Sequence, residues 1–259
     1  MTASYNNVQI LGVNFFNDTL EHALNIAHES GGLILAPSGP GLAELGKNPL
    51  YDTALKEADI NLIDSGYLAL LWQKNTGHKI KRHSGLKYIK SLIEDPRFKE
   101  NKKQLWIMPT EKNASVTQNY LISQQIVLME NNFYVAPFYQ PTAIEDADLL
   151  EQIKTERPEY IIFAIAGGKQ EILGHWIRKH LDYKPAIICI GAAIAFLSGQ
   201  QAKIPSWADR FYIGWFLRII ADPKTFIPRY WKAQKLRSLL SRYGENSPPS
   251  SLSHSTASN

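Results

Sequence analysis

The chain has 259 residues, of which 44% are hydrophobic and 20% are charged, and its formal net charge is +4. This composition excludes intrinsic disorder over most of the chain and allows a sizeable core in one domain, alone or with an extension. The single cysteine, Cys189, excludes an internal disulfide and a metal site built from several cysteines, and it fits a reducing compartment best.

At the N-terminus, the residues MTASYNNVQILGV have neither the positive start nor the apolar stretch of a secretory signal. No run in the sequence approaches the roughly 18 to 20 apolar residues that a membrane-spanning helix needs. We therefore expect a cytoplasmic protein whose contact with a membrane is peripheral.

Short apolar runs alternate with amphipathic segments through residues 1–199, a pattern typical of βα units around a largely parallel sheet. A capping box at Asp18 opens a predicted helix at Thr19–Ser30, and one at Thr142 opens a predicted helix at Ala143–Thr155. The predicted strands are Val8–Val13, Leu33–Leu35, Ile60–Ile63, Leu105–Met108, Tyr160–Ile165 and Ala186–Ile190. The fold class predicted for this core is therefore α/β, with a Rossmann-like, largely parallel sheet and flanking helices.

Beyond Gly199 this alternation stops. Residues 200–243 are predicted to form a basic helical appendage, with breaks near Pro223 and Pro228. The last residues, 244–259, have no apolar periodicity and are predicted to be a disordered tail.

The predicted appendage is strongly cationic. Nine Lys or Arg against two Asp give it a charge of +7, so the rest of the chain carries about −3. Such an asymmetry indicates an anionic partner, which can be a phosphate group, a membrane surface or a nucleic acid. Tryptophans among the cations favour lipid headgroups, although amphipathic helices often carry a solvated cationic face. These tryptophans are Trp207, Trp215 and Trp231.

Ligands of an open α/β sheet bind outside the carboxyl ends of its strands, so polar residues just after a predicted strand are candidate site residues. Residues 36–41, APSGPG, contain Ser38, and their glycines either let backbone N–H groups approach a phosphate or form a plain tight turn. The carboxylate of Asp64 either caps the following helix or acts as general base toward a sugar hydroxyl, and the residues alone favour the cap. Ser84, in RHSG, is a helix cap or a ligand contact, and spacing alone favours the cap.

A further polar cluster, Lys169, Gln170 and Glu171, follows the strongly apolar strand YIIFAIA and two glycines. Three polar residues in the first turn of a helix at a strand's carboxyl end either face a ligand or begin a solvated helix, and the sequence favours neither. No DxD-like pair follows a predicted strand, so no metal site is predicted.

In this order, the segments resemble the WecG/TagA/CpsF glycosyltransferases, glycosyltransferase family 26, from Val8 to about Leu240. The resemblance begins with ILGVNFFNDTLEHAL, continues with NPLYDTALKEADINLID and RHSG, and is sharpest at PEYIIFAIAGGKQE. It then runs through IGAAIAFLSGQQAKIPSWADRFYIGWFLRIIADP. Several matched blocks at consistent spacing make the resemblance specific.

The resemblance implies an inverting, metal-independent enzyme without a cofactor, which moves a sugar from a nucleotide-sugar, expected to be UDP-linked, to a polyprenyl-diphosphate-linked acceptor in bacterial cell-surface polysaccharide synthesis. It makes Asp64 the candidate base, and it places Trp215 and Arg218 in an appendage that closes over the donor pocket. The predicted substrate-binding residues are Ser38, Ser84, Lys169, Gln170, Glu171, Lys203, Arg210, Trp215 and Arg218.

Beyond its substrates, the expected partner is an anionic membrane surface at the inner face of the plasma membrane. A nucleic acid is not expected, because the chain has no nucleic-acid-binding motif. The sequence leaves the oligomeric state open, a homo-oligomer included.

The chain also departs from the family pattern. Where the family usually reads Thr-x-Asn-x-Glu, this chain has Ala36, Ser38 and Pro40. The other departures are Ser65 for Gly, Gly168 for Pro, Ala195 for Asp, Lys203 for Arg, Gly214 for Glu, and Pro109 and Thr110 in place of a glycine-rich turn. They leave an alternative open, a catalytically degenerate member that binds a nucleotide-sugar or a partner enzyme without turnover.

Overall fold

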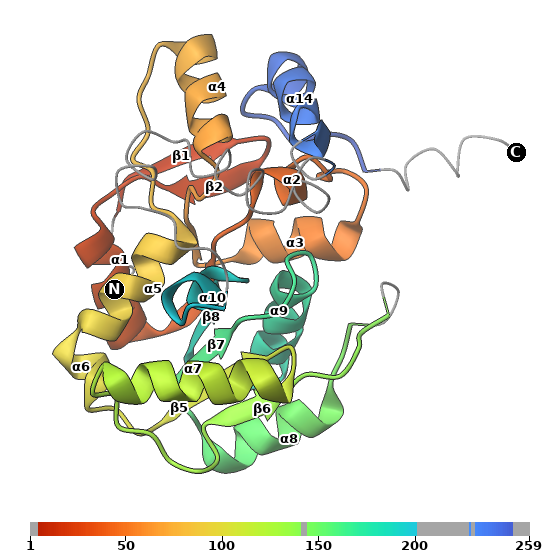
Figure 1. Cartoon of the computed structure of the whole chain (residues 1–259). Coiled ribbons are helices and arrows are strands. Elements are labelled where there is room, and N and C mark those ends of the chain that lie inside the picture. Colours follow the sequence, from red (N-terminus) through yellow and green to blue (C-terminus); the bar gives the residue numbers. More distant parts are fainter. Residues whose placement is uncertain (1–4, 141–143, 201–227, 229–230, 251–259) are drawn as a thin grey trace, which may run out of the picture.

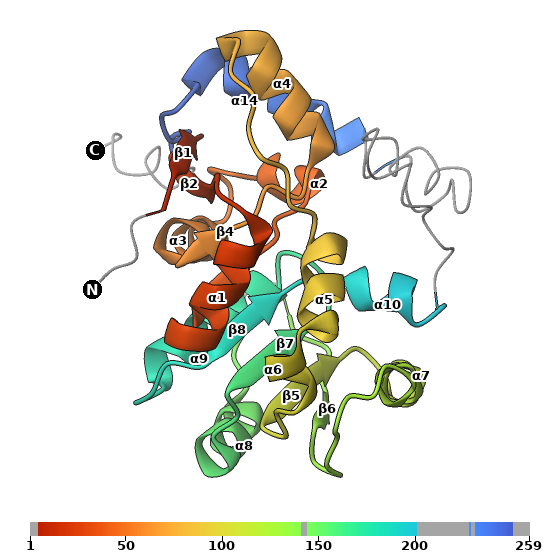
Figure 2. The same ribbon diagram turned by 90° about the vertical axis from the view of Figure 1, so that its left-hand side faces the viewer.

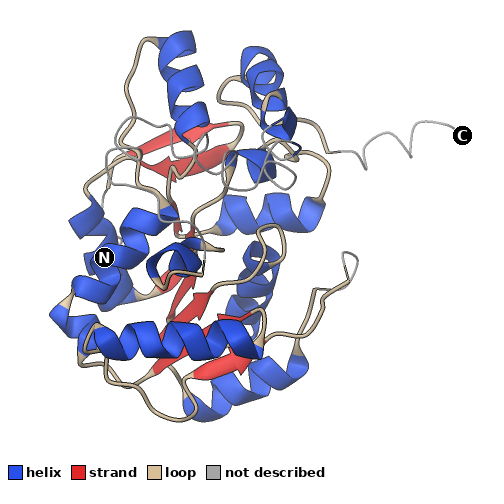
Figure 3. Ribbon diagram, viewed as in Figure 1, coloured by secondary structure: helices blue, strands red, loops and turns tan. Residues whose placement is uncertain are grey.

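The computed structural model describes residues 5–140, 144–200, 228 and 231–250. The strands of its main sheet are β3 (Gly32–Leu35), β4 (Ile60–Asn61), β5 (Gln104–Met108), β6 (Phe133–Val135), β7 (Tyr160–Phe163) and β8 (Ala186–Cys189). They form a six-stranded sheet in the order β4-β3-β8-β7-β5-β6, and every neighbouring pair is parallel. Helices surround this sheet (Figure 3), so the predicted Rossmann-like α/β fold is confirmed.

Helices cover both faces of the sheet. The helices of the described residues are α1 (Leu20–Ser30), α2 (Gly39–Leu42), α3 (Pro49–Glu57), α4 (Gly66–Thr76), α5 (Gly85–Glu94), α6 (Pro96–Lys99), α7 (Glu111–Ser123), α8 (Ala147–Glu156), α9 (Gln170–His180), α10 (Ala193–Leu197) and α14 (Lys235–Tyr243). Helices α3, α8 and α9 pack on one face, and α1, α5, α7 and α10 pack on the other (Figures 1 and 2).

The sequence of β3 shows why two layers form. Side chains of a strand alternate between the two faces of its sheet. Leu33 and Leu35 lie in the apolar cluster with α3 and α9, while Ile34 lies in the cluster with α1 and α5. Because both faces of the sheet are buried, a parallel strand in it needs a continuous run of apolar residues. The sequence of β3 has such a run, and the run predicts the strand.

The first predicted strand, Val8–Val13, is wrong as a member of this sheet. The chain instead forms an antiparallel hairpin of β1 (Asn7–Ile10) and β2 (Val13–Phe16) in a separate two-stranded sheet. Its turn consists of Leu11 and Gly12, whose φ angles are +53° and +76°. A tight hairpin turn requires two consecutive residues with positive φ, usually Gly, Asn or Asp. Because one of them here is a leucine, the sequence does not indicate the turn.

The start of α1 also differs from its prediction. Thr19 is the N-cap, because its hydroxyl accepts a hydrogen bond from the backbone N–H of His22. Asp18 is not the cap: its carboxylate accepts a hydrogen bond from the Thr19 N–H and pairs with the His22 ring. Asp18 therefore stabilises the first turn of α1 from the position before the N-cap.

Two more differences lie between β5 and β7. The three-residue strand β6 was not predicted. The helix α8 begins after Asp146, whose carboxylate accepts a hydrogen bond of 2.9 Å from the Leu149 N–H, and not at the predicted capping box. Of that box, Glu145 precedes the helix, and Thr142 lies outside the described residues.

The helix α14 packs against the core beside α4 (Figure 2). Leu236 and Leu240 are buried in the same apolar cluster as α3 and α9. Beyond the helix, the carbonyl oxygens of Gly244 and Glu245 accept hydrogen bonds of 2.9 and 2.7 Å from backbone N–H groups of the β1–β2 turn. The last helix of the predicted appendage and the first residues of the predicted tail therefore contact the core.

Within the described residues, no helix has both the length and the apolar character that crossing a bilayer requires.

Candidate active site

Loops that follow neighbouring strands meet at the carboxyl edge of the sheet. A Cβ atom built on Gly85 would lie 3.2 Å from the Cβ of Ala36, after β3, and 3.6 Å from the carbonyl oxygen of Ile190, after β8. A Cβ atom built on Gly39 would lie 2.9 Å from Oγ of Ser65, after β4. The structure therefore brings the predicted segments together at the edge where an open α/β sheet binds its ligands.

Asp64 follows β4 but does not cap the helix after it, so the interpretation that the residues alone favoured is wrong. Ser65 is the N-cap of α4, and its hydroxyl accepts a hydrogen bond from the Leu68 N–H. The half-buried Asp64 carboxylate reaches the start of α5, where Oδ1 accepts a hydrogen bond of 3.0 Å from the Gly85 N–H. Among the described residues, Oδ2 accepts no hydrogen bond. One oxygen thus orients the carboxylate, and the other can accept a proton.

Arg82, which is not among the predicted site residues, also lies at this edge. Its Nε–H donates a hydrogen bond of 2.9 Å to the backbone carbonyl oxygen of Asp64. A guanidinium next to the start of α5 strengthens a region that already favours anions, because a helix N-terminus is electropositive. The sequence RHSG contains a signal for this role, because its arginine stands two residues before Ser84, the N-cap of α5.

Ser38 and Ser84 are both helix caps. Ser38 opens α2, where its hydroxyl accepts a hydrogen bond of 3.3 Å from the Gly41 N–H. Ser84 is buried and opens α5, where its hydroxyl accepts a hydrogen bond of 3.2 Å from the Lys87 N–H. The capping role predicted for Ser84 is confirmed, and a contact of either hydroxyl with a substrate stays a prediction.

Gln170 and Glu171 are buried and connect two loops of the edge. Oε1 of Gln170 accepts a hydrogen bond of 2.8 Å from the Gly191 N–H, in the loop after β8, and its amide donates to Glu171. Oε2 of Glu171 accepts a hydrogen bond of 2.6 Å from the Gly168 N–H. Burial raises the pKa of the Glu171 carboxyl, and the hydrogen bonds that it accepts oppose this shift. Both side chains hold the loop after β7 in shape, and their contact with a ligand stays a prediction.

Lys169 differs from these two neighbours because it is half-buried. Its Nζ donates a hydrogen bond of 2.6 Å to the carbonyl oxygen of Tyr139 and lies 4.1 Å from the centroid of the Phe138 ring. The Tyr139 hydroxyl in turn donates a hydrogen bond of 2.6 Å to Asp146, the N-cap of α8. The ammonium is therefore held between the loop after β7 and the segment after β6.

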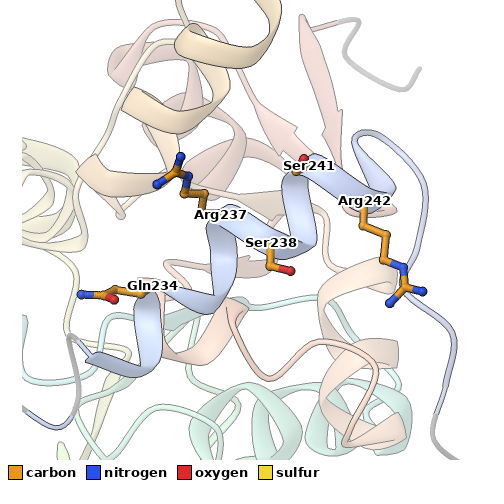
Figure 4. A pocket seen from close by; sticks show the side chains of 5 residues that line it. All are labelled: Gln234, Arg237, Ser238, Ser241 and Arg242. Carbon is orange, nitrogen blue, oxygen red and sulfur yellow. The ribbon is translucent and has the colours of Figure 1, made fainter.

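A second polar feature lies on α14. Its exposed face borders an open surface pocket of about 430 Å³, and the described residues that line this pocket are Gln234, Arg237, Ser238, Ser241 and Arg242 (Figure 4). Their spacing places them on one side of the helix, away from the buried Leu236 and Leu240. Arg237 and Arg242 point in different directions from that side (Figure 4).

The other predicted substrate-binding residues lie outside the described part of the chain, and their roles stay predictions. They are Lys203, Arg210, Trp215 and Arg218. Within the described ranges, no group of three or more His, Cys, Asp or Glu side chains is placed to hold a metal ion.

The chain is similar to known glycosyl transferases over most of its length. The family described as "Glycosyl transferase WecG/TagA/CpsF family" matches residues 8–245. A relative from Bacillus spizizenii (strain ATCC 23059 / NRRL B-14472 / W23), named N-acetylglucosaminyldiphosphoundecaprenol N-acetyl-beta-D-mannosaminyltransferase, is 22% identical over 212 residues, and the match covers 78% of each chain. A protein of the same name from Bacillus subtilis (strain 168) is 28% identical over 102 residues, 39% of this chain and 37% of that protein. Since the family match spans most of the sequence, the chain belongs to the WecG/TagA/CpsF family of glycosyl transferases.

Proposed function

We propose that this glycosyltransferase moves a sugar from a UDP-linked donor to an acceptor carried on a polyprenyl diphosphate, with inversion at the anomeric carbon. The observation that carries the proposal is the Asp64 carboxylate, which is oriented through Oδ1 at the ligand-binding edge while Oδ2 can accept a proton. The names of the two Bacillus relatives specify an acceptor of this class. They support a role in bacterial cell-surface polysaccharide synthesis.

In the proposed reaction, a hydroxyl oxygen of the acceptor attacks the anomeric carbon of the donor sugar while Asp64 takes the hydroxyl proton. The bond between that carbon and the nucleoside diphosphate breaks, and its electron pair leaves with the diphosphate. A single displacement of this kind inverts the configuration. Arg82, beside Asp64, and Lys169, on the neighbouring loop, are the described cations that we assign to offsetting the diphosphate charge without a metal ion.

We place the reaction at the cytoplasmic face of the plasma membrane, with the protein bound peripherally. Two features support this placement. Residues 200–243 carry a charge of +7, and Trp231, within that stretch, is 72% exposed. Cations and indole rings at a surface favour anionic headgroups.

The test is transfer by the purified chain, supplied with a panel of UDP-sugars that includes UDP-N-acetylmannosamine and with a short-chain polyprenyl-diphosphate N-acetylglucosamine. We expect mass spectrometry to detect a lipid product that is heavier by one sugar residue, formed at the same rate when EDTA is added. Donor binding without transfer of any sugar would support the degenerate alternative, which Ala36, Pro40 and Ala195 motivate. A rate that EDTA abolishes and manganese restores would contradict the metal-independent mechanism.

A further inference from the structure

The chain leaves the candidate active site at Asp64 and returns to it at Gly85, whose N–H donates a hydrogen bond to Asp64 Oδ1. Between these two residues, α4 rises away from the sheet and the chain turns back at the far end of the helix (Figures 1 and 2). Residues 73–79, at this turn, are all exposed. The segment is therefore an outward extension whose two ends are fixed at the candidate base.

This extension carries only positive charge. From Ser65 to Ser84 the sequence contains no Asp or Glu, whereas it contains four Lys or Arg. Lys81 lies 3.8 Å from a carboxylate oxygen of Asp18. Lys74 and Lys79, in the exposed turn, form no ion pair with any described residue. The turn thus presents cations whose charge no acidic side chain of the described structure neutralises.

An exposed apolar side chain accompanies these cations. Leu70 is 50% exposed and stands one helical turn before Lys74, so both lie on the same face of α4. The neighbouring helix α14 contacts α4 and exposes Arg237 and Arg242, and residues 231–243 contain no acid. In both views α4 and α14 form the same end of the molecule (Figures 1 and 2).

We infer that this end docks on an anionic lipid bilayer through residues 70–79 together with the exposed face of α14, a region called here the α4–α14 surface. The inference rests on the proposed function, because it is the lipid-linked acceptor that brings the enzyme to a bilayer. Cations are attracted to the anionic leaflet, and a half-exposed leucine can enter the boundary between headgroups and acyl chains. The exposed leucine beside the cations favours a bilayer over a nucleic acid.

Docking through the α4–α14 surface would fix the distance between the bilayer and Asp64. The α4 extension is joined to Asp64 at both ends. A bilayer bound at its tip therefore lies at a fixed separation from the candidate base. The diphosphate of a lipid-linked acceptor lies at the headgroup level, so docking sets how far the acceptor sugar must reach to meet Asp64.

The test compares the intact chain with the double variant Lys74→Gln/Lys79→Gln in co-sedimentation with vesicles of phosphatidylglycerol and phosphatidylcholine. We expect the variant to bind these vesicles about 25-fold more weakly, because each lysine near an anionic surface contributes about a factor of five. The matched control is Lys102→Gln/Lys103→Gln, two exposed lysines before β5 at the opposite end of the strands, and it should bind like the unmodified chain. Pure phosphatidylcholine vesicles should bind all three proteins weakly.

Two outcomes would overturn the inference. One is vesicle binding that Lys74→Gln/Lys79→Gln leaves unchanged, or that the control pair weakens equally. The other is tighter binding of the unmodified chain to a single-stranded RNA oligonucleotide than to the anionic vesicles, which would assign the surface to a nucleic acid.

Turnover separates this inference from the proposed function. With a short-chain acceptor in solution, the double variant should react at the rate of the unmodified chain, whereas with a long-chain acceptor embedded in vesicles its rate should fall together with binding. If the unmodified chain reacts with neither acceptor, the proposed function fails, and the vesicle measurement still decides whether the α4–α14 surface binds lipid.

Discussion

Asp64 and Ser65 are neighbours in the loop after β4, and their side chains have different roles in the structure. Asp and Ser are both good N-cap residues, so the local pattern cannot decide which of them the helix uses. Ser65 caps α4, which leaves the Asp64 carboxylate for the start of α5 and the ligand-binding edge. It is the resemblance to the family, and not the spacing, that indicates a base at this position.

Lys169, Gln170 and Glu171 form one polar cluster in the sequence, but the structure separates them. The partner of Gln170 is the Gly191 N–H, 21 residues further along the chain. A sequence pattern does not show such a partner, because it depends on how β7 and β8 pair. The location of the cluster at the carboxyl edge could be predicted, whereas its division into buried and half-buried members could not.

We expect Gln170→Ala to lower the free energy of unfolding by about 1–3 kcal/mol, because it leaves the Gly191 N–H without its partner near the core. The half-buried Lys169 is the matched comparison. Lys169→Ala should cost less than about 1 kcal/mol of stability and should weaken UDP-sugar binding. Urea unfolding and calorimetric titration measure the two quantities. Equal stability of Gln170→Ala and the unmodified chain would show that the bond to the loop after β8 has no structural role.

The sequence pattern of α14 does not show what its apolar face packs against. An amphipathic basic helix has the same pattern whether its apolar side packs on its own core or on a membrane. The predicted boundary after Gly199 followed the end of the strand and helix alternation, yet Leu236 and Leu240 are buried among residues of the core. The hairpin of β1 and β2 is a similar case, because its turn uses a non-glycine residue with positive φ.

Leu236→Ala should lower the free energy of unfolding by about 2–5 kcal/mol, because it opens a cavity at a fully buried position. Ser238, on the exposed face of the same helix, provides the control, and Ser238→Ala should stay within about 0.5 kcal/mol of the unmodified chain. Urea unfolding measures both. For the same reason, truncation after Gly199 should destabilise the remaining core. A Leu236→Ala variant as stable as the unmodified chain would mean that α14 is a separable appendage.

At the scale of the whole molecule, the fold class could be predicted because parallel strands buried on both faces leave long apolar runs in the sequence. The edge strand β6 was missed because it has three residues, all half-buried, and leaves no such run. The order of the strands was also beyond the sequence, since β3 pairs with β8 from the other end of the core. In the observed strand order, the predicted segments lie at one edge of the sheet. This order therefore places the loops after the neighbouring strands next to Asp64.

Proton removal by Asp64 is tested most directly by the initial rate of transfer of Asp64→Asn, measured beside the unmodified chain with donor affinity determined on the same preparations. The amide oxygen of Asn can still accept the hydrogen bond from the Gly85 N–H, so the fold and the donor affinity should be retained. The rate should fall by about 10² to 10⁴, because the amide cannot take a proton from the acceptor hydroxyl. A rate within a few-fold of the unmodified chain would contradict the assignment of Asp64 as the base.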